Sequence, residues 1–171
     1  MVFQGFKEPK SKRRIRSFIA IAPVSADGYP ATKEDMVFFN TVIMSKAASA
    51  KDFFALTGQR HSPVWGEVKA SQHLQTAKKE ALQGYLHMWA HTDISEEISQ
   101  ANIDITILVI GGRQDLLGFQ EEHFKKTFGK WYKNLTIKYI SDAGYYPIEE
   151  TPIYLASLIN EILTANKKER T

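Results

Sequence analysis

Two predicted strands in the second half of the chain are each followed by side chains that could carry chemistry. Asp115 comes after the apolar run ITILVIGG, and Tyr145 and Tyr146 come after the run LTIKYIS. A carboxylate can orient a cationic base and stabilise its charge. A tyrosine titrates near pH ~10, so at neutral pH it donates a hydrogen bond but is a poor base. These two loops therefore supply an acid and two phenols, but no base.

The histidines are the other candidate bases or metal ligands in the sequence. They are His61, His73, His87, His91 and His123. His87 and His91 lie one helical turn apart, a spacing that could suggest a metal pair. No glutamate stands between them in an H-E-x-x-H arrangement, and no third ligand is evident. We therefore expect no metal and no cofactor.

The composition limits the classes of protein to consider. A length of 171 residues suits one domain, and 43% hydrophobic with 24% charged residues is typical of globular proteins. The chain has no cysteine, which excludes disulfides, a thiol nucleophile and cysteine-bound metal. No apolar run approaches the ~18 residues of a membrane span. A cytoplasmic protein without membrane contact is expected.

The net charge of +3 comes largely from one short stretch, KEPKSKRRIR, from Lys7 to Arg16. Such a run is usually a solvated turn between two elements. Nucleic-acid binding is the alternative, since phosphate contacts need clustered lysine and arginine. No aromatic residue interleaves the run, so the solvated turn is favoured and nucleic acid is an unlikely partner.

Three short apolar runs predict buried parallel strands. They span residues 17–23, 105–112 and 135–141, the first two near-continuously apolar and the third less so. Continuous apolar runs are typical of strands that are buried on both faces. Strand and helix alternate toward the C-terminus, which implies an α/β class with parallel crossovers.

Helical periodicity fills much of the remaining sequence. Helices are predicted over residues 33–44 after the N-cap Thr32, 74–89, 118–128 and 152–163. About 80 residues separate the first two strands, where a simple crossover needs only about a dozen. An inserted helical segment is therefore expected between these two strands.

Three segments, in this order, resemble the C-terminal half of the α/β-hydrolase fold. IRSFIAIAPVSADGYP is similar to its sixth strand, and ITILVIGGRQD is similar to the seventh strand with its acid loop. ISDAGYYPIEETPIYLASLINEIL is similar to the eighth strand, the histidine loop (G-H-x-P-x-x-E-x-P) and the closing helix. The resemblance implies one partial domain over residues 1–171, with about three parallel strands flanked by helices and a helical cap insertion at residues 30–100.

The resemblance also implies roles for individual residues. Asp115 would be the acid of the catalytic triad, and Tyr145 stands where the family has its histidine. The nucleophile elbow G-x-S-x-G is not found, and MVFQGFKEP resembles the helix that follows it. Asp27 is a second candidate for the triad acid. The residues ADGYP are also typical of a turn, and the turn is the favoured interpretation. Trp89, His91, Asp27 and Tyr146 are expected to line the substrate pocket.

Several functions follow from this reading. The favoured one is a protein derived from a hydrolase of esters or related carbonyl compounds, inactive as this chain alone. The alternative is a non-catalytic binding or assembly module, whose unpaired first strand would pair with another copy or with the absent N-terminal half. Nucleic-acid binding through residues 7–16 is the third.

Overall fold

The computed structural model describes residue 15 and residues 17–101 and 103–168. The basic stretch at residues 7–16, expected to be a solvated turn, and the segment that resembles the helix after the elbow lie outside these residues, apart from residue 15. No described helix is both long enough and apolar enough to cross a membrane.

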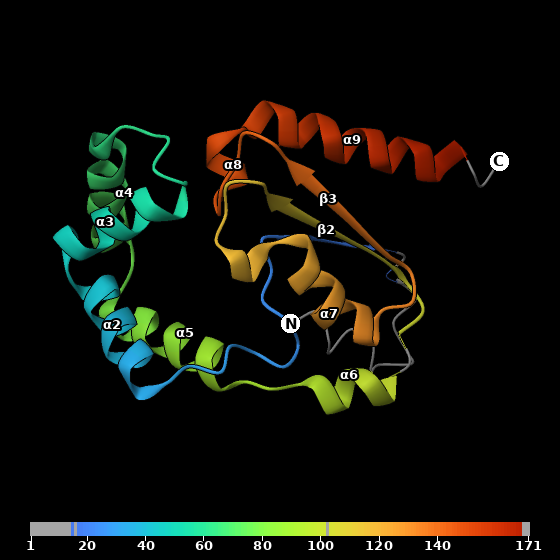
Figure 1. Ribbon diagram of the computed structural model, residues 1–171, viewed down its shortest axis with the longest axis horizontal. Coiled ribbons are helices and arrows are strands. Elements are labelled where there is room, and N and C mark those ends of the chain that lie inside the picture. The colour runs from blue at the N-terminus through green and yellow to red at the C-terminus, as the bar shows by residue number, and fades with distance from the viewer. Residues whose placement is uncertain (1–14, 16, 102, 169–171) are drawn as a thin grey trace.

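The centre of the fold is a parallel sheet in the order β1-β2-β3 (Figure 1). Its strands are β1 (Ser17–Ile21), β2 (Thr106–Gly112) and β3 (Leu135–Ile140). Ile19 is in register with Leu108, and Val109 with Ile137. The three predicted parallel strands are therefore confirmed.

The strands differ in burial from the sequence prediction. In β2 every residue after Thr106 is buried, as expected for a central strand. In β1 only Ala20 is buried, and the rest of the strand is half-exposed. The prediction that this strand is buried on both faces is wrong, because β1 lies at the edge of the described sheet.

Helices cover both faces of the sheet (Figure 1). The helix α7 (Glu121–Trp131) packs Phe124 and Phe128 against Val109 on one face. The helix α9 (Pro152–Lys168) packs Leu155 against Leu108 and Ile110 on the other. The predicted 118–128 segment is divided into the short 3-10 helix η1 (Leu117–Phe119) and α7.

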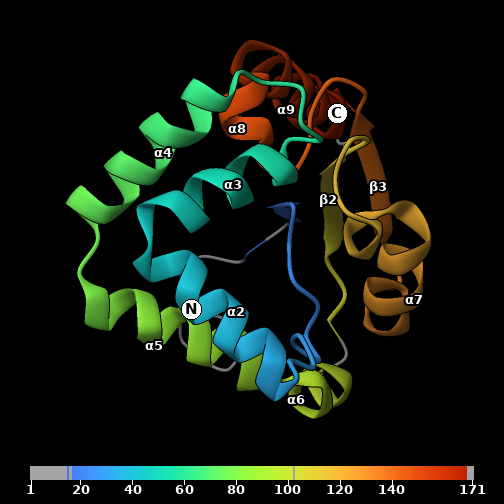
Figure 2. The same ribbon diagram turned by 60° about the vertical axis from the view of Figure 1, so that its left-hand side comes forward.

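The segment between β1 and β2 contains helices throughout, and we call residues 33–101 the helical insertion. Its helices are α2 (Lys33–Met44), α3 (Lys46–Leu56), α4 (Pro63–Thr76), α5 (Lys79–His91) and α6 (Ser95–Ala101). Figure 2 shows α2 to α5 in an arc beside the sheet. The α2 helix starts as predicted, because Thr32 and Asp35 form a reciprocal capping box.

One predicted helix of the insertion is wrong. Residues 74–89 belong to two helices, since the backbone is extended at Ala77 and Lys78. The break lets α4 pack on α3 while α5 returns to pack on α2. One straight helix could not make both sets of contacts, and the local sequence carries no proline or glycine at the break.

Candidate active site

The loops after β2 and β3 meet at the carboxyl edge of the sheet. The Arg113 N–H donates to the Ile140 carbonyl at 3.0 Å, and the Gln114 N–H donates to the Ala143 carbonyl at 2.9 Å. Parallel strands present their carboxyl ends at one edge, so both loops begin there. This junction brings Asp115 into the electrostatic range of Tyr145.

Asp115 is a buried carboxylate with only part of its hydrogen-bonding capacity used. The side chain follows β2 directly, and the residue is 9% exposed. Its Oδ1 accepts the Leu116 N–H at 2.7 Å, whereas its buried Oδ2 has no hydrogen-bond partner among the described residues. Burial raises the pKa of Asp115 to about 6; the Leu116 N–H opposes that rise, and the charge of Glu150 adds to it.

Tyr145 lies between the β2 loop and the helical insertion. Its ring packs edge-on against Phe119 at 5.0 Å and against Tyr146 at 5.1 Å. Its backbone N–H donates to the Leu56 carbonyl of α3 at 2.9 Å. Burial, and then the negative charges of Asp115 and Asp52, raise the pKa of the Tyr145 phenol. The phenol therefore stays protonated at neutral pH.

Tyr146 faces the aromatic side chains of the insertion. Its ring centroid lies 5.4 Å from that of Phe53 and 6.3 Å from that of Trp65. Burial, followed by the charge of Asp52, raises the pKa of Tyr146 as well. Both phenols therefore stay protonated at neutral pH, which leaves each with a proton to donate to a ligand.

A cleft of about 190 Å³ lies between the end of β1 and the Tyr145 loop. Its lining comprises Ile21, Ala22, Tyr145, Tyr146, Pro147, Ile148 and Glu149. Ala22 adopts a positive φ of 44°, a conformation that costs energy for a residue with a Cβ. The chain therefore enters this cleft in a strained turn directly after the strand.

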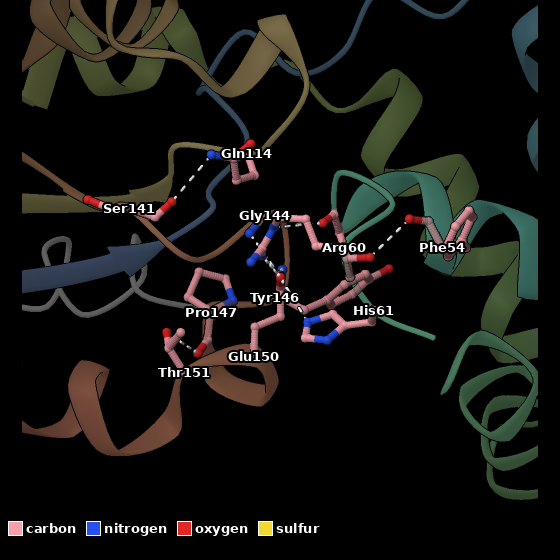
Figure 3. A network of polar contacts seen from close by, with 11 residues as sticks. Phe54, Arg60, His61, Gln114, Ser141, Gly144, Tyr146, Pro147, Glu150 and Thr151 are labelled. Atoms are coloured by element: carbon pink, nitrogen blue, oxygen red, sulfur yellow. Dashed lines mark hydrogen bonds and ion pairs between the residues drawn. The ribbon is translucent and has the colours of Figure 1, made fainter. Parts of the chain in front are cut away.

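Glu150 organises the Tyr145 loop, as Figure 3 shows. Its side chain is fully buried, and its carboxylate accepts the N–H groups of Gly144 and Tyr146. Arg60, from the loop between α3 and α4, forms an ion pair with the same carboxylate. His61 Nε2 lies 3.3 Å from Glu150 Oε2 without hydrogen-bond geometry. Besides the backbone bond from Tyr145 to Leu56, this carboxylate therefore joins the insertion to the loop.

Other residues singled out in the sequence lie in different surroundings. Asp27 Oδ2 is 3.6 Å from the Lys130 Nζ of α7, within a turn closed by the Gly28 N–H on the Ser25 carbonyl at 3.0 Å. This geometry is that of a turn, as the favoured interpretation of ADGYP predicts.

The two residues predicted from α5 to line the pocket have contacts elsewhere. Trp89 stacks on Tyr29 at 4.4 Å and meets Phe39 edge-on. His91 is exposed, and its ring lies 4.5 Å from that of His87. Within the described part of the chain, no group of three or more histidine, aspartate or glutamate side chains could hold a metal.

Asp52 and Arg60 are neighbours of the site that no pattern in the sequence indicated. Asp52 is half-buried in α3, and burial raises its pKa. Arg60 is 90 residues from Glu150 in the sequence, and no local pattern marks the pair. The resemblance singled out the Tyr145 loop, but not the side chains that the insertion brings to it.

Comparison with known proteins gives matches among solved structures. No protein-family sequence model matches the chain, and neither does any curated protein. The bromoperoxidase from Bacillus anthracis has a TM-score of 0.71 at 15% identity, covering 98% of this chain and 63% of its own. An esterase from Exiguobacterium antarcticum has a TM-score of 0.67 at 10% identity, covering 94% of this chain and 60% of its own.

The enol-lactonase from Burkholderia xenovorans LB400 is similar too, with a TM-score of 0.66 at 16% identity, covering 91% of this chain and 58% of its own. The chain thus spans about 60% of the length of these structures. At such identities the similarity establishes the fold and leaves the substrate open. The chain has the fold of the C-terminal half of an α/β-hydrolase.

Proposed function

We propose that this chain supplies the acid and cap part of a hydrolase of esters or related carbonyl compounds, and that it does not turn over esters alone. The observation that carries this proposal is the placement of Tyr145. It lies in the loop after β3, where burial, and then the negative charge of Asp115, raise the pKa of its phenol. In this reading Asp115 is the triad acid, Tyr145 occupies the position of the base, and the helical insertion is the cap.

The chemistry explains why activity should be low. A general base works best when its pKa lies near the operating pH. The phenol of Tyr145 is protonated at neutral pH, so it cannot accept the proton of a nucleophile. The sequence also contains no G-x-S-x-G elbow. The nucleophile would have to come from the remainder of the fold, in a longer form of the protein or in a second chain.

Two assays on the chain alone test this proposal. Hydrolysis of p-nitrophenyl acetate is expected at the buffer rate, and a serine-directed fluorophosphonate is expected to leave no stoichiometric adduct by mass spectrometry. The proposal that the chain is inactive alone would be refuted by two results together: labelling of a serine, and ester turnover that is lost in Asp115→Asn.

A complementation assay tests the role of position 145. A segment carrying strands and a nucleophile elbow would be supplied in trans, with the Tyr145 chain and with Tyr145→His. The histidine variant is expected to be faster by about 100-fold or more, the typical contribution of a general base. Equal rates in the two complexes would refute the assignment of position 145 to the base.

A non-catalytic assembly module is the second candidate, and the edge of β1 favours it. The Ala22 N–H donates to the Ile110 carbonyl of β2 at 2.9 Å. Because successive N–H groups of a strand point to opposite sides, those of Ile19 and Ile21 point away from β2. Such groups are a template for another strand. We expect light scattering to show a dimer or a larger complex. Ser17→Pro removes a backbone N–H from β1 and should weaken this association, whereas Ser17→Ala keeps the N–H and should preserve it. A stable, monodisperse wild-type monomer would contradict this candidate.

A further inference from the structure

A second concave site lies in the helical insertion, between α3 and α4. It is a groove of about 570 Å³, within the range of about 300–1,000 Å³ typical of small-molecule sites. Its apolar lining comes from Ala47, Ala50, Phe54 and Pro63. Its charged rim consists of Lys46, Lys51 and Glu67.

The groove is built into a tight helix pair, which Figure 2 shows side by side. A Cβ at Gly66 of α4 would lie 2.6 Å from the Ala50 carbonyl oxygen, so the two backbones approach directly. Ser49, next to Ala50, is buried, and its hydroxyl donates to the Val42 carbonyl of α2. The α3 wall of the groove is therefore held by α4 on one side and by α2 on the other.

The groove uses a different face of α3 from the Tyr145 cleft. Residues four apart share a helix face. Lys46, Ala50 and Phe54 form one such row on the groove side. Phe53 and Leu56, on another side of the same helix, contact Tyr146 and Tyr145. A ligand in the groove would thus be separated from the cleft by the body of α3.

The charges of the groove select the kind of ligand. Among the described residues, neither Lys46 nor Lys51 forms an ion pair, and both are exposed at the rim. Their stems can extend the apolar wall while each ammonium group faces the ligand. Lys46 is also the first residue of α3, where the helix dipole favours an anion. Glu67 is the single opposing carboxylate in the lining.

We propose that the α3–α4 groove binds a free medium-chain carboxylate, with its alkyl chain over Ala50 and Phe54 and its carboxylate between Lys46 and Lys51. The row from Lys46 to Phe54 spans eight residue steps, or about 12 Å of helix. That length suits an extended chain of decanoate size and not a short acid. The site does not depend on Tyr145 or on hydrolase activity.

Titration of the full chain with decanoate, below its micelle concentration, tests the site by calorimetry and NMR. Lys46→Gln/Lys51→Gln is expected to weaken binding by about tenfold, because two exposed ion pairs are lost. The matched control, Lys33→Gln/Lys79→Gln, removes two exposed lysines from other helix starts and is expected to bind as the wild type. Added salt should weaken wild-type binding.

A second variant tests the apolar floor independently of charge. Ala47 is exposed, so Ala47→Trp can fill the groove without entering the core, and it is expected to abolish binding. Decanol and butyrate should both bind much more weakly than decanoate. The proposal is overturned if decanoate does not bind, if decanol binds equally well, or if either groove variant binds like the wild type. Preferential binding to phosphatidylglycerol vesicles would overturn it in favour of a membrane surface.

Discussion

Both carboxylate oxygens of Glu150 accept the Gly144 N–H, with N···O distances of 2.9 Å to Oε1 and 3.0 Å to Oε2. The same buried group holds Arg60 of the helical insertion. Backbone N–H groups and a guanidinium together supply the donors that a buried carboxylate needs. The conformation of the Tyr145 loop therefore depends on a residue five positions later and on a distant loop.

Glu150→Gln is expected to lower the free energy of unfolding by about 2 kcal/mol, because the charge-assisted hydrogen bonds from the Gly144 and Tyr146 N–H groups are weakened and the ion pair with Arg60 is lost. Urea denaturation measures the loss. The matched control is Glu149→Gln, since Glu149 pairs with Lys69 at the surface. That substitution should cost at most about 1 kcal/mol. Equal losses for the two variants would show that the Glu150 network is not a main stabiliser.

Gly144→Ala is expected to destabilise the protein by about 2 kcal/mol through overpacking. A Cβ at this position would lie 2.4 Å from the Leu56 carbonyl oxygen and 2.9 Å from the Thr57 Cα. Gly129→Ala, in α7, is the control, because a Cβ there would have no described neighbour within 4 Å outside its own helix backbone. It should stabilise the helix by about 0.5–1 kcal/mol. Unchanged thermal stability in Gly144→Ala would mean that the insertion does not press on this loop.

Asp115 should make stability depend on pH. Its pKa of about 6 in the folded state lies above the unfolded value of about 3.9. The folded state therefore binds more protons between these values, and stability falls as the pH rises from about 4 to about 6. Asp115→Asn removes the buried charge and should be more stable than the wild type at pH 7 by about 3 kcal/mol, because each pKa unit corresponds to about 1.4 kcal/mol.

The gain from Asp115→Asn should vanish near pH 4, where Asp115 is neutral in the folded protein. Denaturation curves of both chains at the two pH values check this. Because burial also raises the pKa of Asp52, the informative quantity is the difference between variant and wild type. A constant difference at both pH values would contradict the assignment to Asp115.

Tyr145→His is expected to give a histidine with a higher pKa than Tyr146→His does. Asp115 has an unpartnered Oδ2, and its charge ranks directly after burial among the influences on Tyr145. At Tyr146 the charge of Asp52 ranks after burial and that of Asp115 contributes least, so Tyr146→His is the control with similar burial and little influence of Asp115. NMR titration of the histidine ring measures both pKa values. A reversed order would contradict the influence of the Asp115 charge on position 145.

Elements with local signals were predicted well from the sequence. Residues 33–44 form the expected helix because Thr32 and Asp35 cap it through contacts three residues apart. The apolar runs of the strands were equally clear, since they need no knowledge of their neighbours. The break after Thr76 was missed because it serves the packing of α4 on α3 and of α5 on α2, which no window of sequence contains.

The sequence by itself determined the residue types at the candidate site, an acid after β2 and a tyrosine in the loop after β3. It also determined that three parallel strands alternate with helices and that a helical insertion lies between the first two strands. Only the tertiary structure decided that Asp115 keeps an unpartnered oxygen and that Arg60 reaches Glu150 across 90 residues. The physical reason is that burial and charge pairing depend on where distant segments meet in space.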